Sequence, residues 1–185
     1  QAEATLKQAA ALNHELGSAV EEATVIAALG WTYERQEKFV DAIASYQSAS
    51  TLFQQQGETA RAARAINNLG MLQLKQANTT AAEATLVQAQ NLSAAIENPE
   101  DANREKAILL DSFGSLHQAK GDFEQAWLTY RQALTLSEQN NDTIGQIDSL
   151  LNLGKLMESQ DQPNLAIFFY KRAIAHIETI RQDLQ

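Results

Sequence analysis

One glycine recurs four times in this chain in the same sequence frame. Each copy directly follows a leucine or a phenylalanine, and the successive intervals are 40, 44 and 40 residues. Self-similarity at such a period is typical of proteins built from stacked structural repeats. We therefore expect an array of four similar units, centred on Gly30, Gly70, Gly114 and Gly154.

Other positions keep the same frame around each glycine. Ile or Leu stands four residues before it, Ala twelve residues after it, a Tyr or Leu four residues further on, and a second Ala three residues later. Steps of three and four residues are typical of helices. Glycine inside a helix costs about 1 kcal/mol relative to alanine, so four in-phase copies indicate a packing requirement where two helices cross. In chain order these positions hold Ile26, Ala42, Tyr46 and Ala49; Ile66, Ala82, Leu86 and Ala89; Leu110, Ala126, Tyr130 and Ala133; and Leu150, Ala166, Tyr170 and Ala173.

This pattern resembles the tetratricopeptide repeat, whose unit is a pair of antiparallel helices. The resemblance implies an all-α fold, a right-handed α-α superhelix with the first helix of each pair on a concave face and the second on the outer face. The chain departs from the motif because Ile or Leu replaces its Trp, its terminal Pro is missing, and the period is near 40 instead of 34. Helices about one turn longer than usual account for the longer period.

The frame also predicts the element boundaries. First helices are expected at 18–36, 58–76, 101–119 and 142–160, and second helices at 39–56, 79–97, 122–139 and 163–183. Residues 1–16 fit a second helix alone, and we expect the chain to be part of a longer protein. Four extra loop residues near Pro99 explain the 44-residue interval. The whole of 1–185 is expected to be one solenoid domain, with full repeats at 18–56, 58–97, 101–139 and 142–183.

A closer resemblance rests on the forty-residue spacing, the Asn-Leu-Gly turns at 68–70 and 152–154, and the segments 165–173 and 177–181. These are similar to the repeats that precede CHAT-type caspase-like peptidase domains in bacteria. Forty-residue repeats also occur in signalling scaffolds, regulators and kinesin light chains. The resemblance implies a regulatory or recognition arm, and no catalytic residue carries over because the chain has no Cys.

Composition narrows the classes of partner. A formal net charge of -9 without a run of Lys and Arg disfavours nucleic acid and anionic membranes as partners. No apolar stretch approaches the length of a membrane span. The absence of Cys fits a reducing, cytoplasmic compartment, although a secreted origin stays open. The three histidines fall in different helices, so we expect no metal site, no cofactor and no enzyme activity; His117 is expected to be a partly buried packing residue.

Helical phase predicts the concave face, because residues near each glycine on the first helices project away from the second helices. Asn amides can donate to and accept from a peptide backbone, and Trp31 can anchor an apolar group. Two alternatives stay open: the asparagines bond between neighbouring helices, and Trp31 covers the end of the array. The candidate peptide-binding residues are Trp31, Arg35, Arg64, Asn67, Asn68, Met71, Lys75, Asp111, Ser115, Asn152 and Lys155, with Ala27, Glu34, Gln118, Asp148 and Glu158 on the same face.

The charges on this face are mixed, so no partner of a single sign is implied. In repeat proteins that grip the C-terminal carboxylate of chaperones, Lys and Asn occupy the inner face of the first repeat. Here Ala27 and Trp31 stand there and only Asn68 matches, which favours a different ligand.

Two apolar groups remain. Phe39, Phe123, Trp127 and Phe168, at or near the start of second helices, are expected in the core. Ile174, Ile177, Ile180 and Leu184 form a stripe on the last helix that no later repeat within 1–185 covers. We expect it to dock a continuing helix or a second copy.

The sequence therefore predicts a scaffold that binds a polypeptide segment on its concave face; the alternative is a structural or self-assembly module without a groove ligand.

Overall fold

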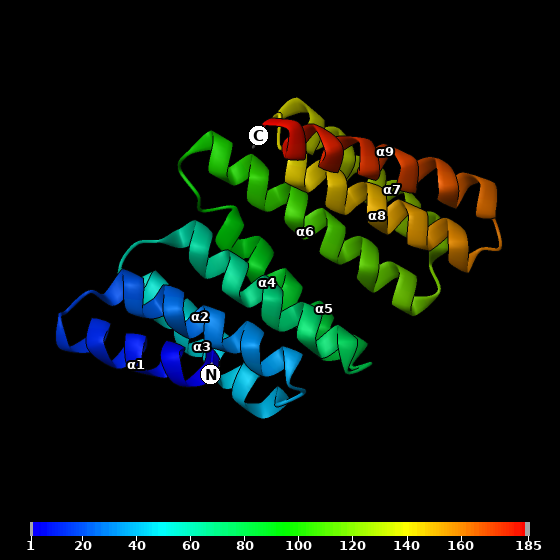
Figure 1. Ribbon diagram of the computed structural model, residues 1–185. Coiled ribbons are helices and arrows are strands. Elements are labelled where there is room, and N and C mark those ends of the chain that lie inside the picture. Colours follow the sequence, from blue (N-terminus) through cyan, green and yellow to red (C-terminus); the bar gives the residue numbers. More distant parts are fainter. Residues whose placement is uncertain (1, 184–185) are drawn as a thin grey trace. The chain divides into compact units, whose positions relative to one another are not determined.

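The computed structural model describes residues 2–183, and within that range the chain is helical without strands (Figure 1). The predicted first helices are α2, α4, α6 and α8, the predicted second helices are α3, α5, α7 and α9, and α1 is the additional second helix. The helices are α1 (Ala2–Glu15), α2 (Ala19–Arg35), α3 (Phe39–Gln55), α4 (Thr59–Lys75), α5 (Thr79–Ser93), α6 (Pro99–Lys120), α7 (Phe123–Gln139), α8 (Thr143–Ser159) and α9 (Pro163–Asp183).

The observed boundaries lie within a few residues of the predicted ones, and the largest difference is between α5 and α6. Helix α5 ends at Ser93 instead of residue 97, and α6 begins at Pro99 instead of residue 101. The reason is a strong start signal at Asn98, whose Oδ1 accepts hydrogen bonds from the backbone N–H of Glu100 at 2.9 Å and of Asp101 at 3.1 Å. Proline at the first helical position and acidic residues in the first turn add to this cap.

Most of the other helices end in the same tight turn. The backbone N–H of the residue after the turn bonds to the carbonyl five residues earlier, as in Lys38 N to Tyr33 O at 2.9 Å and Asn78 N to Gln73 O at 3.0 Å. The residue before that N–H has a left-handed backbone, which terminates the helix. These left-handed residues are Gly17, Glu37, Gly57, Ala77, Gly121, Asn141 and Asp161.

The helices form two compact units, the first ending at Glu97 and the second beginning at Asn98. In the first unit α2 packs on α3 and α4 on α5, α1 packs on α2, and α3 joins the two pairs by packing on α4. In the second unit α6 packs on α7, α8 on α9, and α7 on α8. Each unit is therefore built from antiparallel helix pairs, and the single domain across both stays a prediction.

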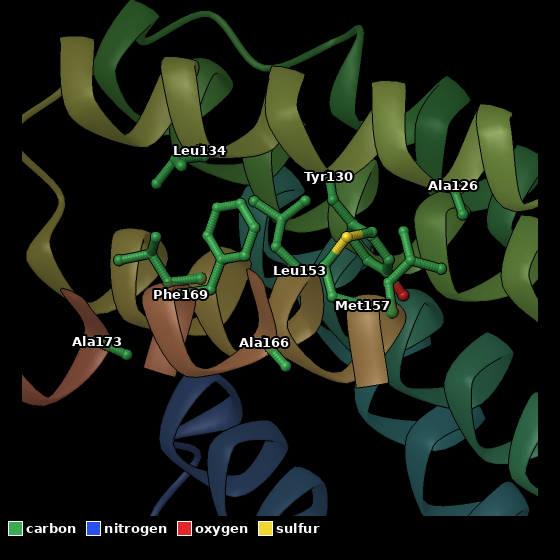
Figure 2. Packing of buried hydrophobic residues seen from close by; sticks show 10 residues of the cluster. Ala126, Tyr130, Leu134, Leu153, Met157, Ala166, Phe169 and Ala173 are labelled. Atoms are coloured by element: carbon green, nitrogen blue, oxygen red, sulfur yellow. The ribbon is translucent and has the colours of Figure 1, made fainter. Parts of the chain in front are cut away.

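The recurring glycines make room for the bulky residue sixteen positions later. A Cβ added at Gly30 would lie 2.8 Å from the Tyr46 ring, and one at Gly114 would lie 2.6 Å from the Tyr130 ring. The framing alanines, such as Ala126 and Ala133, are fully buried beside these contacts. Figure 2 shows the core of the second unit, where larger side chains gather between helices that the alanines allow to approach. Its labelled members are Ala126, Tyr130, Leu134, Leu153, Met157, Ala166, Phe169 and Ala173.

Two of the four aromatic residues expected in the core are not there. Phe123 is 39% exposed and Phe168 is 52% exposed, whereas Phe39 and Trp127 are partly buried. Phe169 takes the core position in α9 and meets the Trp127 ring edge-on at 5.8 Å. Phe168, one residue away on the helix, consequently faces outward.

Candidate functional site

In the first unit, the predicted residues on α2 and α4 form an exposed polar surface with one aromatic anchor. Trp31 is 59% exposed, and the Arg35 guanidinium lies 5.6 Å from the centre of its ring. Glu34 links the two first helices, because its carboxylate accepts a hydrogen bond from Lys75 Nζ on α4 at 3.3 Å. It also accepts one from the Tyr46 hydroxyl on α3 at 3.3 Å. We call this the α2–α4 surface, and its members are Trp31, Arg35, Arg64, Asn68, Met71 and Lys75.

Asn67 does not belong to this surface. Its side chain is only 4% exposed, and its Oδ1 has no hydrogen-bond partner within residues 2–183. Asn68, one residue further along α4, is half-buried and reaches the surface. Of these two adjacent asparagines, only Asn68 is placed to meet a ligand.

A hollow of about 340 Å³ opens between α2 and α4, and we call it the α2–α4 hollow. Ala65 and Phe53 are buried and form its apolar base, whereas Arg61 and Arg64 are exposed at its border. The Asn68 amide lies in its wall and makes no hydrogen bond with another side chain or a backbone group in the described part of the chain. The full lining is Thr24, Ala27, Phe53, Arg61, Arg64, Ala65 and Asn68.

Three of the predicted residues of the second unit, Asp111, Ser115 and Asn152, instead form hydrogen bonds with one another or with neighbouring side chains, whereas Lys155 is exposed. The Asp111 carboxylate on α6 accepts from Ser149 Oγ at 2.7 Å and from Asn152 Nδ2 at 3.3 Å, both on α8. The alternative that an asparagine bonds between neighbouring first helices is therefore confirmed for Asn152. Ser115 also lies in this network, because its hydroxyl is 3.0 Å from the Tyr130 hydroxyl and donates to the Asp111 carbonyl.

Burial dominates the electrostatics of this second network. The pKa of Asp111 is raised to about 7: burial is the largest cause, the hydrogen bonds from Ser149 and Asn152 act against it, and the charge of the nearby Asp148 adds to it. Burial also raises the pKa of Asp148, against the opposing effect of Lys155. Burial therefore makes both carboxyl groups harder to ionise than an exposed aspartate.

The predicted site residues thus fall on two surfaces, one in each unit. Sequence reasoning missed Thr24, Phe53, Arg61 and Ala65, which also line the α2–α4 hollow. For the two residues on α4 a signal was available in the repeat frame, since Arg61 and Ala65 lie nine and five residues before Gly70 and so share a side of α4 with Asn68. A second hollow, of about 590 Å³ between α6 and α7, contains none of the predicted residues.

Other kinds of site find no support in the described residues. Within 2–183, no group of three or more His, Asp or Glu side chains is arranged to hold a metal ion. None of the helices described is both long and apolar enough to cross a membrane. His117 is partly buried, as expected, and its Nδ1 lacks a hydrogen-bond partner in this range.

Comparison with known proteins identifies the type of repeat. The tetratricopeptide repeat family model matches residues 25–58 and 109–143. The solved structure of BtubC (BKLC) from P. vanneervenii is similar, with a TM-score of 0.63 and 18% identity over 87% of this chain and 65% of that one. Aspartyl phosphate phosphatase F from Bacillus subtilis is also similar, with a TM-score of 0.66 and 18% identity over 92% of this chain and 45% of that one.

The chain therefore spans less than two thirds of the length of either solved relative. No curated protein sequence matches it. At this level of identity the likeness shows the fold, which is an all-α helical repeat of the tetratricopeptide type.

Proposed function

We propose that this tetratricopeptide-type repeat chain is a protein-interaction module that binds a polypeptide segment of a partner along the α2–α4 surface. The observation that carries the proposal is the α2–α4 hollow, because it combines an apolar base, two bordering guanidinium groups and an amide that no other side chain or backbone group of the described chain engages. Repeat arrays present such surfaces as extended binding faces. In this role the chain would be the recognition or regulatory part of a larger protein.

The chemistry of the surface suits an extended peptide. A peptide backbone offers a carbonyl acceptor and an N–H donor at nearly every residue, and the Asn68 amide can meet both. Trp31 supplies a large, exposed apolar area for a side chain, and exposed tryptophan and arginine are enriched among residues that dominate binding energy. Because Glu34 lies beside Lys75, the surface carries charges of both signs. It should therefore select a ligand with a specific arrangement of charges and not bind every acidic or every basic peptide.

A displayed peptide library tests this function. Peptides selected on the native protein should bind about tenfold more weakly after Asn68→Ala or Arg64→Ala, since each change removes a hydrogen-bonding side chain from the surface. Val87→Ala on α5 is the matched control, because Val87 is 42% exposed on a second helix and lies outside the surface. Helicity should stay unchanged by circular dichroism. Binders indifferent to both surface changes would show that the groove assignment is wrong.

A specific observation also favours self-association through α9 as a second candidate function. Ile174 and Ile177 are 52% and 47% exposed. The corresponding residues forty positions earlier are Leu134 and Ser137 on α7. They are only 7% and 0% exposed, and helix α8 packs on α7. The predicted apolar stripe on α9 is therefore exposed at positions that the next helix covers in the preceding repeat. Leu184, the fourth residue of this stripe, lies outside the described residues.

Sedimentation velocity over a hundredfold range of concentration tests this candidate. If α9 pairs with a second copy, the native chain should dimerise with concentration and Ile177→Asp should make it monomeric, because pairing would bury the new carboxylate without a partner. A native chain that stays monomeric throughout, with or without this change, would contradict self-association.

The resemblance of residues 165–173 and 177–181 to repeats before CHAT-type peptidase domains supports a further proposal, that the partner domain in the same protein is a peptidase. The complete reading frame tests it. A peptidase-like domain after residue 185 would support the regulatory role, and an unrelated neighbour would contradict it.

A further inference from the structure

The hollow of about 590 Å³ between α6 and α7, which we call the α6–α7 hollow, combines leucine side chains with basic ones. Lys106 and Leu110 line it from α6, and Leu128, Arg131 and Leu136 line it from α7. Leu128 is 42% exposed, and both basic side chains are exposed as well. None of the lining residues is acidic, although the chain has a net charge of -9. The hollow is therefore an apolar strip with local positive charge on an acidic protein.

Neither of these two cations is paired with an acid in the described part of the chain. Lys106 makes no hydrogen bond or ion pair within residues 2–183. The Arg131 guanidinium lies 5.7 Å from the centre of the Trp127 ring, one turn earlier on α7. This contact with the ring face leaves its N–H donors unused. A carboxylate that enters the hollow can therefore accept charge-assisted hydrogen bonds from both side chains.

The repeat frame shows what covers the corresponding place in other repeats. There the second helix of the preceding repeat packs on the first helix, as α1 does on α2, α3 on α4, and α7 on α8. Leu150 on α8, the frame equivalent of Leu110, is fully buried in a cluster with Leu134 of α7. Leu110 is only half-buried. A helix is therefore the element that the repeat accepts at such a place.

The covering helix α7 also supplies a charged side chain. Glu138 of α7 accepts a hydrogen bond from the Arg172 guanidinium of α9 at 3.1 Å, and Leu134, one turn earlier on α7, is buried. In the repeat frame Arg172 corresponds to Gln132, which lines the α6–α7 hollow. In the last repeat this place is thus covered by a helix that carries a leucine and an acid one turn apart.

Helix α1 carries a basic residue at the same frame position. His14 lies 3.1 Å from the Glu22 carboxylate of α2, and Glu22 corresponds to Lys106 in the frame. Because Lys106 has the opposite sign, an acid is the complementary group over α6. In the second helix before α6, the frame position of His14 holds Ala94, one residue beyond the end of α5 at Ser93. That helix carries no acid at this position, so the acid has to come from a partner.

From these observations we propose that the α6–α7 hollow docks an amphipathic helix of a partner protein, which seats an apolar stripe on the leucines and directs acidic residues to Lys106 and Arg131. The lining on α7 runs from Leu128 to Gln139, which is about 16 Å or three turns of helix. A helix suits this lining better than an extended segment, because a helix satisfies its own backbone groups and the hollow offers side chains. This surface is separate from the α2–α4 surface and does not depend on it.

A displayed library of helices tests this inference. Each member is about three turns long and is held helical by a side-chain cross-link, with leucine along one stripe and Glu, Gln or Lys at the flanking positions. Selection on the native protein should enrich Glu beside the stripe. Selection on the double variant Lys106→Glu with Arg131→Glu should enrich Lys instead. An enriched acidic helix should bind this variant about tenfold more weakly than the native protein, measured by fluorescence anisotropy.

Lys171→Glu is the matched control, because Lys171 is exposed on α9 at the frame position of Arg131 and lies outside the hollow. It should bind the acidic helix as the native protein does. Lys106→Glu alone should also weaken binding, and it breaks no hydrogen bond or ion pair of the described chain that could be needed for folding. Asn68→Ala and Ile177→Asp should change nothing, which separates this surface from the α2–α4 surface and from the stripe on α9.

Isotope-labelled protein locates the bound helix. The side-chain amides of Gln132 and Gln139, which both line the hollow, should shift when the acidic helix is added. The inference is contradicted if the native protein selects no helix, if acidic and basic helices are enriched alike, or if Lys171→Glu weakens binding as much as Lys106→Glu. If the same sequences bind only without the cross-link, the ligand is an extended segment and helix docking is wrong.

Discussion

At the scale of single residues, the recurring glycine is matched to the side chain sixteen positions later. A methyl group added at Gly114 would meet the rigid ring of Tyr130, whereas one added at Gly70 would meet the Cδ2 end of Leu86 at 2.8 Å. Overpacking of a core costs about 1–3 kcal/mol, and replacing a helical glycine by alanine returns about 1 kcal/mol of helix propensity. The two glycines should therefore differ in their tolerance of alanine.

We expect Gly114→Ala to lower the free energy of unfolding by about 1–2 kcal/mol. Gly70→Ala should cost less, because the end of a leucine side chain can rotate away. Urea unfolding of the two variants beside the native chain measures both values. Equal effects, or a more stable Gly114→Ala protein, would show that the glycine is not required by the tyrosine ring.

Asp111 predicts a pH dependence. Its pKa rises from an ordinary value of 3.8 to about 7 in the folded chain, chiefly through burial. The folded state therefore holds this proton more tightly than the unfolded state. The stability that Asp111 contributes is complete below about pH 4 and is lost as the pH rises through 7.

The variant Asp111→Asn should remove this dependence while keeping an acceptor for Ser149. Thermal unfolding between pH 4 and pH 8 should show the native Tm falling relative to that of the variant, with the change concentrated between pH 4 and pH 7. The raised pKa of Asp148 acts in the same direction in both proteins, so the difference between them reports Asp111 together with its repulsion by Asp148. Parallel curves for the two proteins would refute the assignment.

At the scale of elements, several helix ends contain a non-glycine residue in the left-handed conformation, and a glycine substitution can relieve this backbone strain. Ala77 ends α4 with φ of 59°, a left-handed conformation that costs a residue with a Cβ about 1–2 kcal/mol. Ala77→Gly should relieve most of this cost, and the greater freedom of glycine in the unfolded chain offsets part of the gain. We expect a net stabilisation of about 0.5–1 kcal/mol, measured by urea unfolding.

Asn141→Gly provides the comparison, because Asn141 has φ of 54° and asparagine adopts this conformation more readily than alanine. Its gain should be smaller than that of Ala77→Gly. Destabilisation by Ala77→Gly would mean that the methyl group of Ala77 contributes more to packing than its backbone costs.

The sequence predicted most of these elements because local signals mark them. Gly17, Gly57 and Gly121 end helices, and the in-phase Gly and Ala positions fix which helices pair. The end of α5 was missed because 94–97 is a good helix-forming stretch, and only the capping by Asn98 shows that the chain has already left the helix. Hydrophobic periodicity alone does not show whether helix propensity or a capping residue decides where a helix ends.

The candidate site was less predictable, since burial depends on which neighbour covers each side chain. Asn67 and Asn68 are adjacent on α4 and were assigned to the same face, yet only Asn68 reaches the surface. Asn152 was correctly placed on a first helix, but its amide donates to Asp111. The α2–α4 hollow forms where Ala27 and Ala65 have small side chains. A small residue does not by itself predict a hollow, because the space beside it also depends on which helix lies opposite.

At the scale of the whole molecule, the repeat provides the same framework four times and lets single substitutions change what each copy does. One frame position holds Ala27 in the first unit, where a hollow opens, and Asp111 in the second, where a hydrogen-bonded network fills the space. The net charge of -9 should repel most acidic partners. Binding of an acidic helix at the α6–α7 hollow would therefore depend on the local charges of Lys106 and Arg131.

The most direct test of the central claim is to map a selected peptide onto the labelled protein by two-dimensional NMR. The account predicts shifts concentrated on α2 and α4, including the indole N–H of Trp31 and the side-chain amide of Asn68, with few on the outward positions of α3 and α5. Shifts confined to second helices, or the failure of any library to yield a binder, would contradict it.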